Sequence, residues 1–302
     1  MTTLQSSQLW EALSDTLFAN VDDDFVANFR KPGGANSRLG SWDPFDKTMR
    51  YFKFMLFSAA ERQQPEFFKH YRALGNVDVG APVSVTVRGC GINIDYLLSV
   101  QEYMFLESCV ALESIRSVVE IGAGFGRTCH TLLSLSDTIE RYTIIDLPNV
   151  LELSRRVLAR TVPHKLGIIE FIDATNDGEW RGLERDLAIN IDSFQEMPPA
   201  TIDTYMSGVV GRCEHFYVKN PVAKYKPSAV GIADSASSGF HDVFSLGYCR
   251  HVIDIFNDLA LAQARQAYVD AYRPASDWKL VADKPAELFP YFHHAFYSSY
   301  RE

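Results

Sequence analysis

The chain has 302 residues, a mass of 34.0 kDa, 47% apolar residues and a formal net charge of −9. This length accommodates one large α/β domain and an accessory segment of about 100 residues. No basic run of five residues occurs, and the pI is near 5.4. These properties disfavour nucleic acid and anionic membrane surfaces as partners.

The cysteines are scattered and form no Cys-x-x-Cys pair: Cys90, Cys109, Cys129, Cys213 and Cys249. This pattern disfavours a disulfide framework and suits a reducing compartment. The first residues lack the basic start and apolar core of a secretory signal peptide, and the most apolar stretch, residues 51–60, is too short to span a membrane. The sequence therefore predicts a cytoplasmic protein.

The first part of the chain is predicted to be mainly helical. Leu9, Leu13 and Leu17 share one helical face. Residues 42–45 (Trp-Asp-Pro-Phe) form an expected turn into an aromatic-rich helix over Met49–Ala60. The aromatic side chains of this helix either pack in the core or line a substrate pocket.

Residues 82–95 alternate in part between apolar and polar and are predicted to form a short β-hairpin. Asp95 is the expected N-cap of a helix that reaches Leu112. We place a domain boundary near residue 95, with a mainly helical cap over residues 1–94 and a catalytic domain over residues 95–302.

The most informative stretch is Ser117–Thr128, with the sequence Ser-Val-Val-Glu-Ile-Gly-Ala-Gly-Phe-Gly-Arg-Thr. Its apolar start predicts a buried parallel strand, and Gly122, Gly124 and Gly126 allow a sharp turn before a helix over residues 128–135. Strand, glycine turn and helix together are typical of a nucleotide-binding unit. The alternative is a tight structural turn that binds nothing.

Glu120 indicates which nucleotide suits this turn. In dinucleotide-binding turns the pyrophosphate lies on backbone amides at the helix N-terminus, where a neighbouring carboxylate would repel it. S-adenosylmethionine has no phosphate and carries an ammonium and a sulfonium group. An acid at position 120 therefore favours S-adenosylmethionine over NAD.

A second expected strand, Arg141–Asp146, ends in an acid at the place where a ribose diol needs a carboxylate acceptor. Pro148 follows and suits the first turn of a helix. Glu120–Gly126 and Asp146–Asn149 together resemble the class I S-adenosylmethionine-dependent methyltransferases.

This resemblance implies a Rossmann-like α/β fold with a seven-stranded methyltransferase sheet and S-adenosylmethionine as the cofactor. We expect the cofactor site at the carboxyl ends of the strands. The candidates are Glu120, Gly122, Ala123, Gly124, Gly126, Arg127, Asp146, Leu147, Asp173, Ala174 and Asn190. Asp173 either meets the adenine amino group or caps the next turn.

The remaining chain continues the alternation of strands and helices. Further strands are predicted at Ile168–Ile172, Leu187–Ile191, Glu214–Val218, Trp278–Ala282 and His294–Tyr300, the last two as an antiparallel edge pair. A helix is expected to start at Pro198–Pro199, and another carries apolar residues from Ile253 to Ala271. The polar span Lys219–Gly247 is expected to be a loop or lid.

Several segments are similar to a family of sugar O-methyltransferases from natural-product and polysaccharide clusters. They are Asp95–Tyr103, Gly124–Arg127, Asn190–Pro198 and Phe216–Asn220. The resemblance implies methyl transfer to a hydroxyl of a small polar acceptor, a sugar or glycosylated metabolite. Nucleic-acid amino-methyltransferases instead carry Asp/Asn-Pro-Pro-aromatic after the fourth strand, where residues 192–195 read Asp-Ser-Phe-Gln.

Methyl transfer to an alcohol needs alignment, exclusion of water and a group that takes the hydroxyl proton. Asp192, Glu196 and His241 are the candidate catalytic residues. His215, His293 and His294 are further titratable candidates, although a strand histidine such as His215 is more often part of a core.

Other interpretations stay open at this stage. Asp192 and Glu196 are also suited to a divalent ion that holds a sugar diol, although metal dependence is not favoured. A nucleotide-binding oxidoreductase, transfer to a non-sugar hydroxyl or amine, and a catalytically silent scaffold are the rival functions. The sequence is also compatible with a homodimer.

Overall fold

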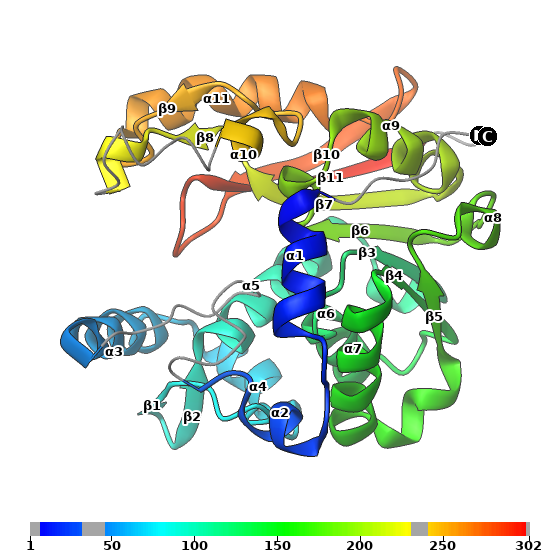
Figure 1. Cartoon of the computed structure of the whole chain (residues 1–302). Coiled ribbons are helices and arrows are strands. Elements are labelled where there is room, and N and C mark those ends of the chain that lie inside the picture. The colour runs from blue at the N-terminus through cyan, green and yellow to red at the C-terminus, as the bar shows by residue number, and fades with distance from the viewer. Residues whose placement is uncertain (1–6, 32–45, 231–240, 300–302) are drawn as a thin grey trace. The chain divides into compact units, whose positions relative to one another are not determined.

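A computed structural model describes the backbone of residues 7–31, 46–230 and 241–299. The side chains of residues 9, 10, 13, 14, 17, 46–48, 50, 241 and 242 lie outside this description. The chain divides into two compact units, each built from separate stretches (Figure 1). Unit 1 is Met1–Trp10, Ser117–Gly122 and Ala174–Glu302; unit 2 is Glu11–Arg116 and Ala123–Asp173. A cap over residues 1–94 stays a prediction.

The predicted seven-stranded α/β sheet is confirmed, with the order β10-β11-β7-β6-β3-β4-β5. The strands are β3 (Ser117–Ile121), β4 (Arg141–Asp146), β5 (Ile169–Asp173), β6 (Leu187–Ile191), β7 (His215–Pro221), β10 (Trp278–Pro285) and β11 (Phe292–Ser299). β6 pairs in parallel with β3 and β7, and β4 pairs in parallel with β5. The expected antiparallel edge is formed by β10 and β11.

Two strands run beyond their predicted ends at Val218 and Ala282. β7 continues to Pro221 because β11 pairs with it as far as Phe292 opposite Pro221. Backbone pairing across the sheet, rather than apolar periodicity, sets these ends. Tyr300, the predicted end of the last strand, lies outside the described residues.

Besides its strands of the large sheet, unit 1 contains further elements after β5, β6 and β7. They are α8 (Asp177–Trp180), η4 (Phe194–Glu196), α9 (Pro199–Gly208), η5 (Val210–Arg212), β8 (Lys224–Tyr225), η6 (Pro227–Val230), α10 (His241–Ser245), β9 (Val252–Ile253) and α11 (Asp258–Ala271). Figure 1 shows α11 in orange; its Tyr268 hydroxyl donates to the His293 carbonyl of β11 at 2.8 Å. This contact packs α11 on the sheet within unit 1.

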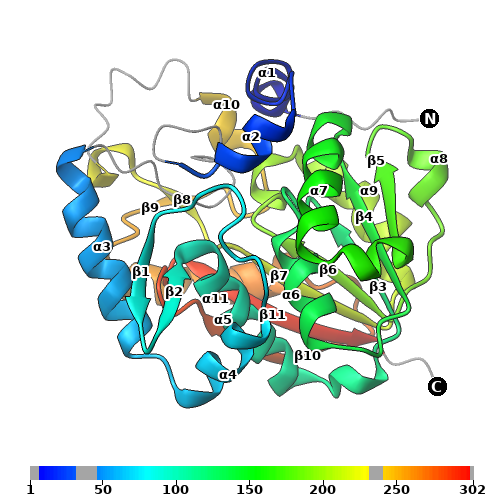
Figure 2. The same cartoon turned by 90° about the horizontal axis from the view of Figure 1, so that it is seen from below.

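Unit 2 is mainly helical before β4 and β5, its two strands of the large sheet. Its elements are α2 (Asp23–Asn28), α3 (Asp46–Glu61), α4 (Pro65–Ala73), β1 (Ser84–Val87), β2 (Cys90–Asn93), α5 (Ile94–Cys109), η2 (Leu112–Ser114), α6 (Arg127–Leu135), α7 (Pro148–Thr161) and η3 (Pro163–Ile168). α1 (Gln8–Leu17) crosses the boundary between the units in sequence. The predicted hairpin is confirmed as β1 and β2, and α3 packs on β1 (Figure 2). α7 packs on β4 and β5.

The N-cap of α5 differs from the prediction. Asn93, not Asp95, caps the helix, and its side chain accepts a hydrogen bond from the Tyr96 amide at 3.1 Å. Asp95 lies in the first turn, where its carboxylate pairs with Arg30 at 2.7 Å. The helix ends at Cys109 rather than at Leu112. Asp95, the N-cap predicted from the local sequence, is therefore engaged in an ion pair with Arg30, which is distant in the chain.

Two predictions after β7 are wrong in part. Lys219 belongs to β7 and Lys224–Tyr225 to β8, so the span from residue 219 to 247 does not form one continuous loop. Ile253 pairs with Tyr225 in β9, and the following helix begins only at Asp258. The apolar spacing that suggested a longer helix arises because a strand residue and the exposed Phe256 happen to fall in register with it.

The aromatic side chains of α3 do not pack in the core as a set. Leu56 and Ala60 are buried, whereas Tyr51, Phe54 and Met55 on the opposite side of the helix are 60–67% exposed. The core-packing interpretation is therefore wrong for these residues. Residues 32–45, which include the expected turn before this helix, lie outside the described residues.

Candidate functional site

The glycine turn after β3 adopts a backbone that only glycine accommodates easily. Gly124 and Gly126 have φ angles of 59° and 88°. A Cβ atom at Gly126 would lie 2.9 Å from Leu158 Cδ1, so the turn packs closely on α7. The Gly126 amide donates to the Ala123 carbonyl at 3.0 Å, which closes the turn before α6. Glycine, which has no Cβ atom, adopts these positive φ angles at little steric cost.

Asp146 holds this turn against the end of β4. Its Oδ2 accepts a hydrogen bond from the Gly124 amide at 2.9 Å, and its Oδ1 accepts one from the Leu147 amide at 2.8 Å. Desolvation raises the pKa of Asp146 to about 7, against the opposing effect of the two amide donors. Each carboxylate oxygen has a further lone pair, so the group can still accept from two hydroxyls of a ligand.

Asp173 lies beside Asp146 at the ends of neighbouring strands. The two residues are register partners in the β4–β5 ladder. Two of the acids expected near the cofactor, Asp146 and Asp173, therefore lie at one edge of unit 2. Whether Asp173 contacts adenine stays a prediction.

In unit 1, the start of the glycine turn touches the loop after β6. Gly122 has a φ of 74°, and a Cβ atom there would lie 2.1 Å from Ser193 Oγ. Ser193 Oγ donates to the Ile121 carbonyl at 3.1 Å, and Asn190 Nδ2 donates to the same carbonyl at 3.0 Å. Position 122 must be glycine because these contacts fill the space of a side chain.

Gly122→Ala is therefore expected to lower the free energy of unfolding by about 1–3 kcal/mol, the usual cost of overpacking. Ser193→Gly removes the atoms that the new Cβ would strike. We expect the double variant to be more stable than the sum of the two single effects predicts, as chemical denaturation in a double-mutant cycle would show. Strictly additive losses would contradict the contact.

Asn190 and Asn220 connect the ends of β6 and β7. Asn220 Nδ2 donates to Asn190 Oδ1 at 2.8 Å, and Asn220 Oδ1 accepts from the Gln195 amide at 3.3 Å. Asn190 is fully buried, and its amide nitrogen also donates to Ser193 Oγ at 2.6 Å. The observed role of Asn190 is to support the loop; direct cofactor contact stays a prediction. Sequence reasoning missed Asn220, since its partners are distant in the chain.

The two predicted catalytic acids, Asp192 and Glu196, flank this loop. Asp192 has a φ of 64°, which is rare for a residue other than glycine, and its amide donates to the Lys219 carbonyl at 2.8 Å. Gln195 Nε2 donates to Asp192 Oδ1. Both acids are partly exposed. Strained backbone of this kind is concentrated at functional sites.

Lys224 reaches the same loop from β8. Its Nζ donates to the Gln195 carbonyl at 2.8 Å, and only 5% of the residue is exposed. Burial lowers the pKa of Lys224, while Glu196, Cys249 and Asp192 oppose this effect. The sequence did not single out Lys224 because it lies in the span expected to be a loop.

The other predicted cofactor residues have structural contacts of their own. Glu120 is buried in β3, with 2% exposure. Arg127 donates to the Asp95 carbonyl at 3.0 Å and to Glu102 Oε1 at 3.1 Å. Ala174 is buried after β5. These contacts are compatible with a role beside the cofactor, which stays a prediction.

The strand histidines are held by neighbouring side chains. His215 Nδ1 hydrogen-bonds with Ser298 Oγ, and His294 Nδ1 with the Tyr217 hydroxyl, both at 2.8 Å. His293 Nε2 lies 2.7 Å from Asp283 Oδ2. The side chain of His241 lies outside the described residues.

Two further features bear on the cofactor and membrane predictions. Among the described residues, no group of three His, Cys, Asp or Glu side chains could hold a metal ion. No helix in the described part of the chain has the length and apolar content needed to cross a membrane.

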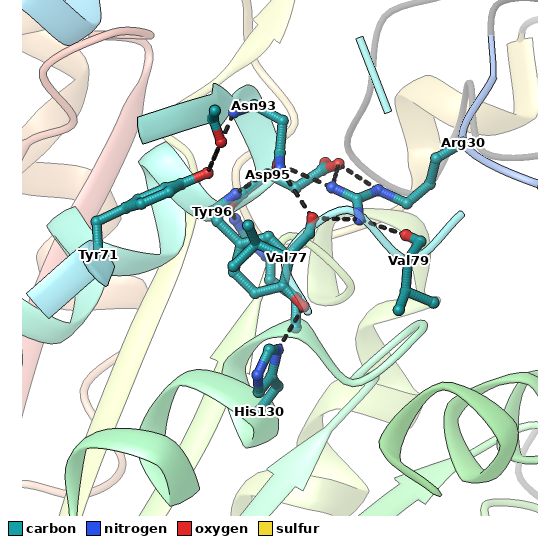
Figure 3. A network of polar contacts seen from close by, with 10 residues as sticks. Arg30, Tyr71, Val77, Val79, Asn93, Asp95, Tyr96 and His130 are labelled. Atoms are coloured by element: carbon teal, nitrogen blue, oxygen red, sulfur yellow. Dashed lines mark hydrogen bonds and ion pairs between the residues drawn. The ribbon is translucent and has the colours of Figure 1, made fainter. Parts of the chain in front are cut away.

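A buried polar network in unit 2 is centred on Arg30 and Asp95 (Figure 3). Arg30 Nε donates to Asp95 Oδ2 at 2.9 Å and Arg30 Nη2 to Asn93 Oδ1 at 2.8 Å. Its guanidinium carbon lies 5.2 Å from the ring centroid of Phe125, which sits between Gly124 and Gly126. The network therefore connects residue 30 to the turn that is expected to bind the cofactor.

No protein-family model matches the chain, and no curated protein matches it. Among solved structures, the chain is similar to the methyltransferase domain of bacterial CtHen1-C at 14% identity and a TM-score of 0.44, over 67% of this chain and 98% of that one. Mitomycin 7-O-methyltransferase MmcR is 12% identical with a TM-score of 0.46, over 81% and 68%.

An O-methyltransferase family protein from Burkholderia thailandensis is 12% identical with a TM-score of 0.42, over 68% of this chain and 58% of that one. These proteins are methyltransferases by name. Likenesses of this size assign neither a family nor a substrate.

Proposed function

We propose that the protein binds S-adenosylmethionine at the glycine turn and transfers its methyl group to a hydroxyl of a small polar acceptor. The observation that supports this most is the position of Asp146, whose carboxylate is bound to the turn through Gly124 and keeps lone pairs for a ribose diol. Asp173 at the neighbouring strand end adds a second acid.

The residues present fit this cofactor better than a dinucleotide. A pyrophosphate needs backbone amides and tolerates no carboxylate close by. Here the Asp146 carboxylate accepts a hydrogen bond from the Gly124 amide, so one of the turn amides that a pyrophosphate would need is already bound to an acid. Glu120 in the preceding strand adds a buried acid. Such surroundings favour a ligand with hydroxyls and cationic groups.

The loop after β6 is the proposed acceptor side. Asn190, Ser193 and Asn220 form its rigid base, and Asp192 and Glu196 lie at its two ends. We infer that the two carboxylates accept hydrogen bonds from acceptor hydroxyls and so fix which oxygen reacts. Two N–H donors lie at the same loop. The side-chain nitrogen of Gln195 donates to Asp192 Oδ1, and Lys224 Nζ donates to the Gln195 carbonyl. A mixture of donors and acceptors suits a sugar.

S-adenosylmethionine supplies an electrophilic methyl group when bound. The protein holds the acceptor oxygen in line with it, excludes water and removes the hydroxyl proton. Asp146 and the glycine turn position the cofactor, and Asp192 and Glu196 position the acceptor.

Isothermal titration calorimetry with S-adenosylhomocysteine, and separately with NAD, tests the cofactor. We expect S-adenosylhomocysteine to bind one site per chain and NAD to bind weakly or not at all. Binding of NAD without S-adenosylhomocysteine would overturn the proposed function. For the acceptor, radioactive methyl transfer to methyl glucoside, galactoside and mannoside is expected for at least one glycoside, and no transfer is expected to tRNA.

A further inference from the structure

Lys224 is a buried cation whose ammonium group makes one hydrogen bond within the described part of the chain, and the acceptor is a carbonyl. Its Nζ donates to Gln195 at 2.8 Å, and no carboxylate among the described residues lies within ion-pair distance. An ammonium group has three N–H donors. Two of them have no protein partner in a place from which water is largely removed, which is costly unless a ligand or a proton shift relieves it.

Lys165 shows how a supporting lysine is bound in this protein. It also donates to a carbonyl, that of Ser136 at 3.2 Å, but it pairs with Asp137 Oδ1 at 2.9 Å as well. It is also more exposed than Lys224. A lysine needed only to hold the loop would be expected to have such a carboxylate partner. Lys224 lacks it in spite of two acids in the neighbourhood.

The groups that face Lys224 come from three segments. Glu196 ends η4, Asp192 follows β6, and Cys249 precedes β9. Burial raises the pKa of the Cys249 thiol to about 12, so this group is neutral at the pH of use. The two acids stabilise the charged lysine and burial opposes it, with burial the larger effect.

We propose that Lys224 is the general base that takes the proton from the acceptor hydroxyl. This role rests on the proposed function, because it places the acceptor at the loop that Lys224 contacts. The carbonyl of Gln195 receives one N–H, which orients the nitrogen and leaves its lone pair for the acceptor. Asp192 and Glu196 then act by orienting the acceptor rather than by taking its proton.

The step balances without any further reactant. The acceptor O–H bond breaks, its proton forms a bond to the lone pair of Nζ, and the oxygen takes the methyl group that the cofactor supplies. The electron pair of the broken carbon–sulfur bond stays on sulfur. The Lys224 ammonium then releases its proton to water before the next turnover. Because the neutral amine is the active form, kcat is expected to rise with pH until Lys224 is deprotonated.

The first test measures Lys224 directly and needs no acceptor. NMR of protein labelled at the lysine ε-carbon, with the Lys224 signal assigned from Lys224→Arg, gives the titration midpoint. We expect this midpoint to lie below the ordinary lysine value of 10.5. A Lys224 midpoint at or above 10.5 would overturn the inference, whatever the outcome with the cofactor.

The second test separates proton transfer from binding. Lys224→Arg keeps a cation and its donors but cannot accept a proton, because the guanidinium stays protonated at any pH at which the protein is folded. We expect kcat on a methyl glycoside to fall by roughly 10²–10⁴-fold, the usual share of a general base. The kcat of Lys224→Ala should fall by a similar factor, and added ethylamine should restore part of it. Lys165→Arg is the matched control and should keep normal turnover.

The acids provide the competing outcome. If Glu196→Gln lost turnover to this extent while Lys224→Arg kept it, Glu196 would be the base and the inference would be wrong. Failure of wild-type protein to bind S-adenosylhomocysteine would instead refute the proposed function. In that case the NMR midpoint would still decide whether Lys224 can serve as a base.

Discussion

Replacing Asp146 with alanine is expected to weaken binding of S-adenosylhomocysteine by roughly 10- to 150-fold. A charge-assisted hydrogen bond contributes about 1.5–3 kcal/mol, which corresponds to this range. Alanine also frees the Gly124 amide that Oδ2 now accepts from. Asp146→Asn keeps the size and one acceptor and should lose less. Calorimetry at pH 8 measures both variants, and unchanged affinity in Asp146→Ala would remove this residue from the site.

The same residue makes cofactor binding dependent on pH. Desolvation raises the pKa of Asp146 to about 7 in the free protein. Ribose hydroxyls donate to the ionised form, so ligand binding below this pH must first expel a proton. Affinity is therefore expected to be constant above pH 7 and to fall by up to about tenfold per pH unit below it. Asp146→Asn should show a flat profile over the same range, which separates this group from other titrations.

Replacing Arg30 with alanine is expected to lower the free energy of unfolding by about 3–5 kcal/mol, the usual cost of breaking a buried ion pair. The side chains of Arg30 and Asp95 are each only 1% exposed. The guanidinium also donates to the Val77 carbonyl at 3.1 Å and the Val79 carbonyl at 2.6 Å. Its removal leaves a buried carboxylate and two carbonyls without this donor.

Arg160 provides the matched control. It pairs with Asp23 at 2.9 Å, but the Asp23 side chain is 87% exposed. An exposed pair of this kind contributes about 0–1 kcal/mol, so Arg160→Ala should change stability little. Urea denaturation followed by circular dichroism measures both variants. Similar small losses for the two arginines would show that the buried network does not hold unit 2 together.

Arg30 also lies against the glycine turn, so its loss has a second expected consequence. Phe29 meets the Phe125 ring edge-on at 5.5 Å between centroids, and the Arg30 guanidinium faces the same ring. Phe29 and Arg30 are neighbours in the chain, so one short segment makes both contacts with the Phe125 ring. Where Arg30→Ala still folds, its affinity for S-adenosylhomocysteine is expected to fall, whereas that of Arg160→Ala should not.

Local patterns in the sequence were sufficient for the elements near the glycine turn. β4 and β6 have their predicted bounds, since buried parallel strands read as short apolar runs bounded by turn residues. Gly124 and Gly126 have the positive φ values that a sharp turn requires. Asp146 could be placed at the end of β4 because apolar periodicity predicts where that strand ends, while its role in binding stays a prediction.

Other positions were decided by partners far away in the chain. The local sequence offered Asp95 as a helix cap, but Arg30, from a segment before the hairpin, takes its carboxylate and leaves the cap to Asn93. Similarly, β8 and β9 are too short to show a period, and each exists because the other pairs with it. Periodicity does not record such pairings.

On the acceptor side of the proposed site, too, local sequence predicts some residues and tertiary structure determines the others. Asp192 and Glu196 follow a predictable strand, so the sequence alone was enough to place them at its end. Asn220 and Lys224 contact Asn190 and Gln195 only because β7 lies beside β6 in the sheet and the chain then returns over the loop. Their hydrogen bonds satisfy groups that folding removes from water, and the partner of a buried polar group is determined by tertiary structure.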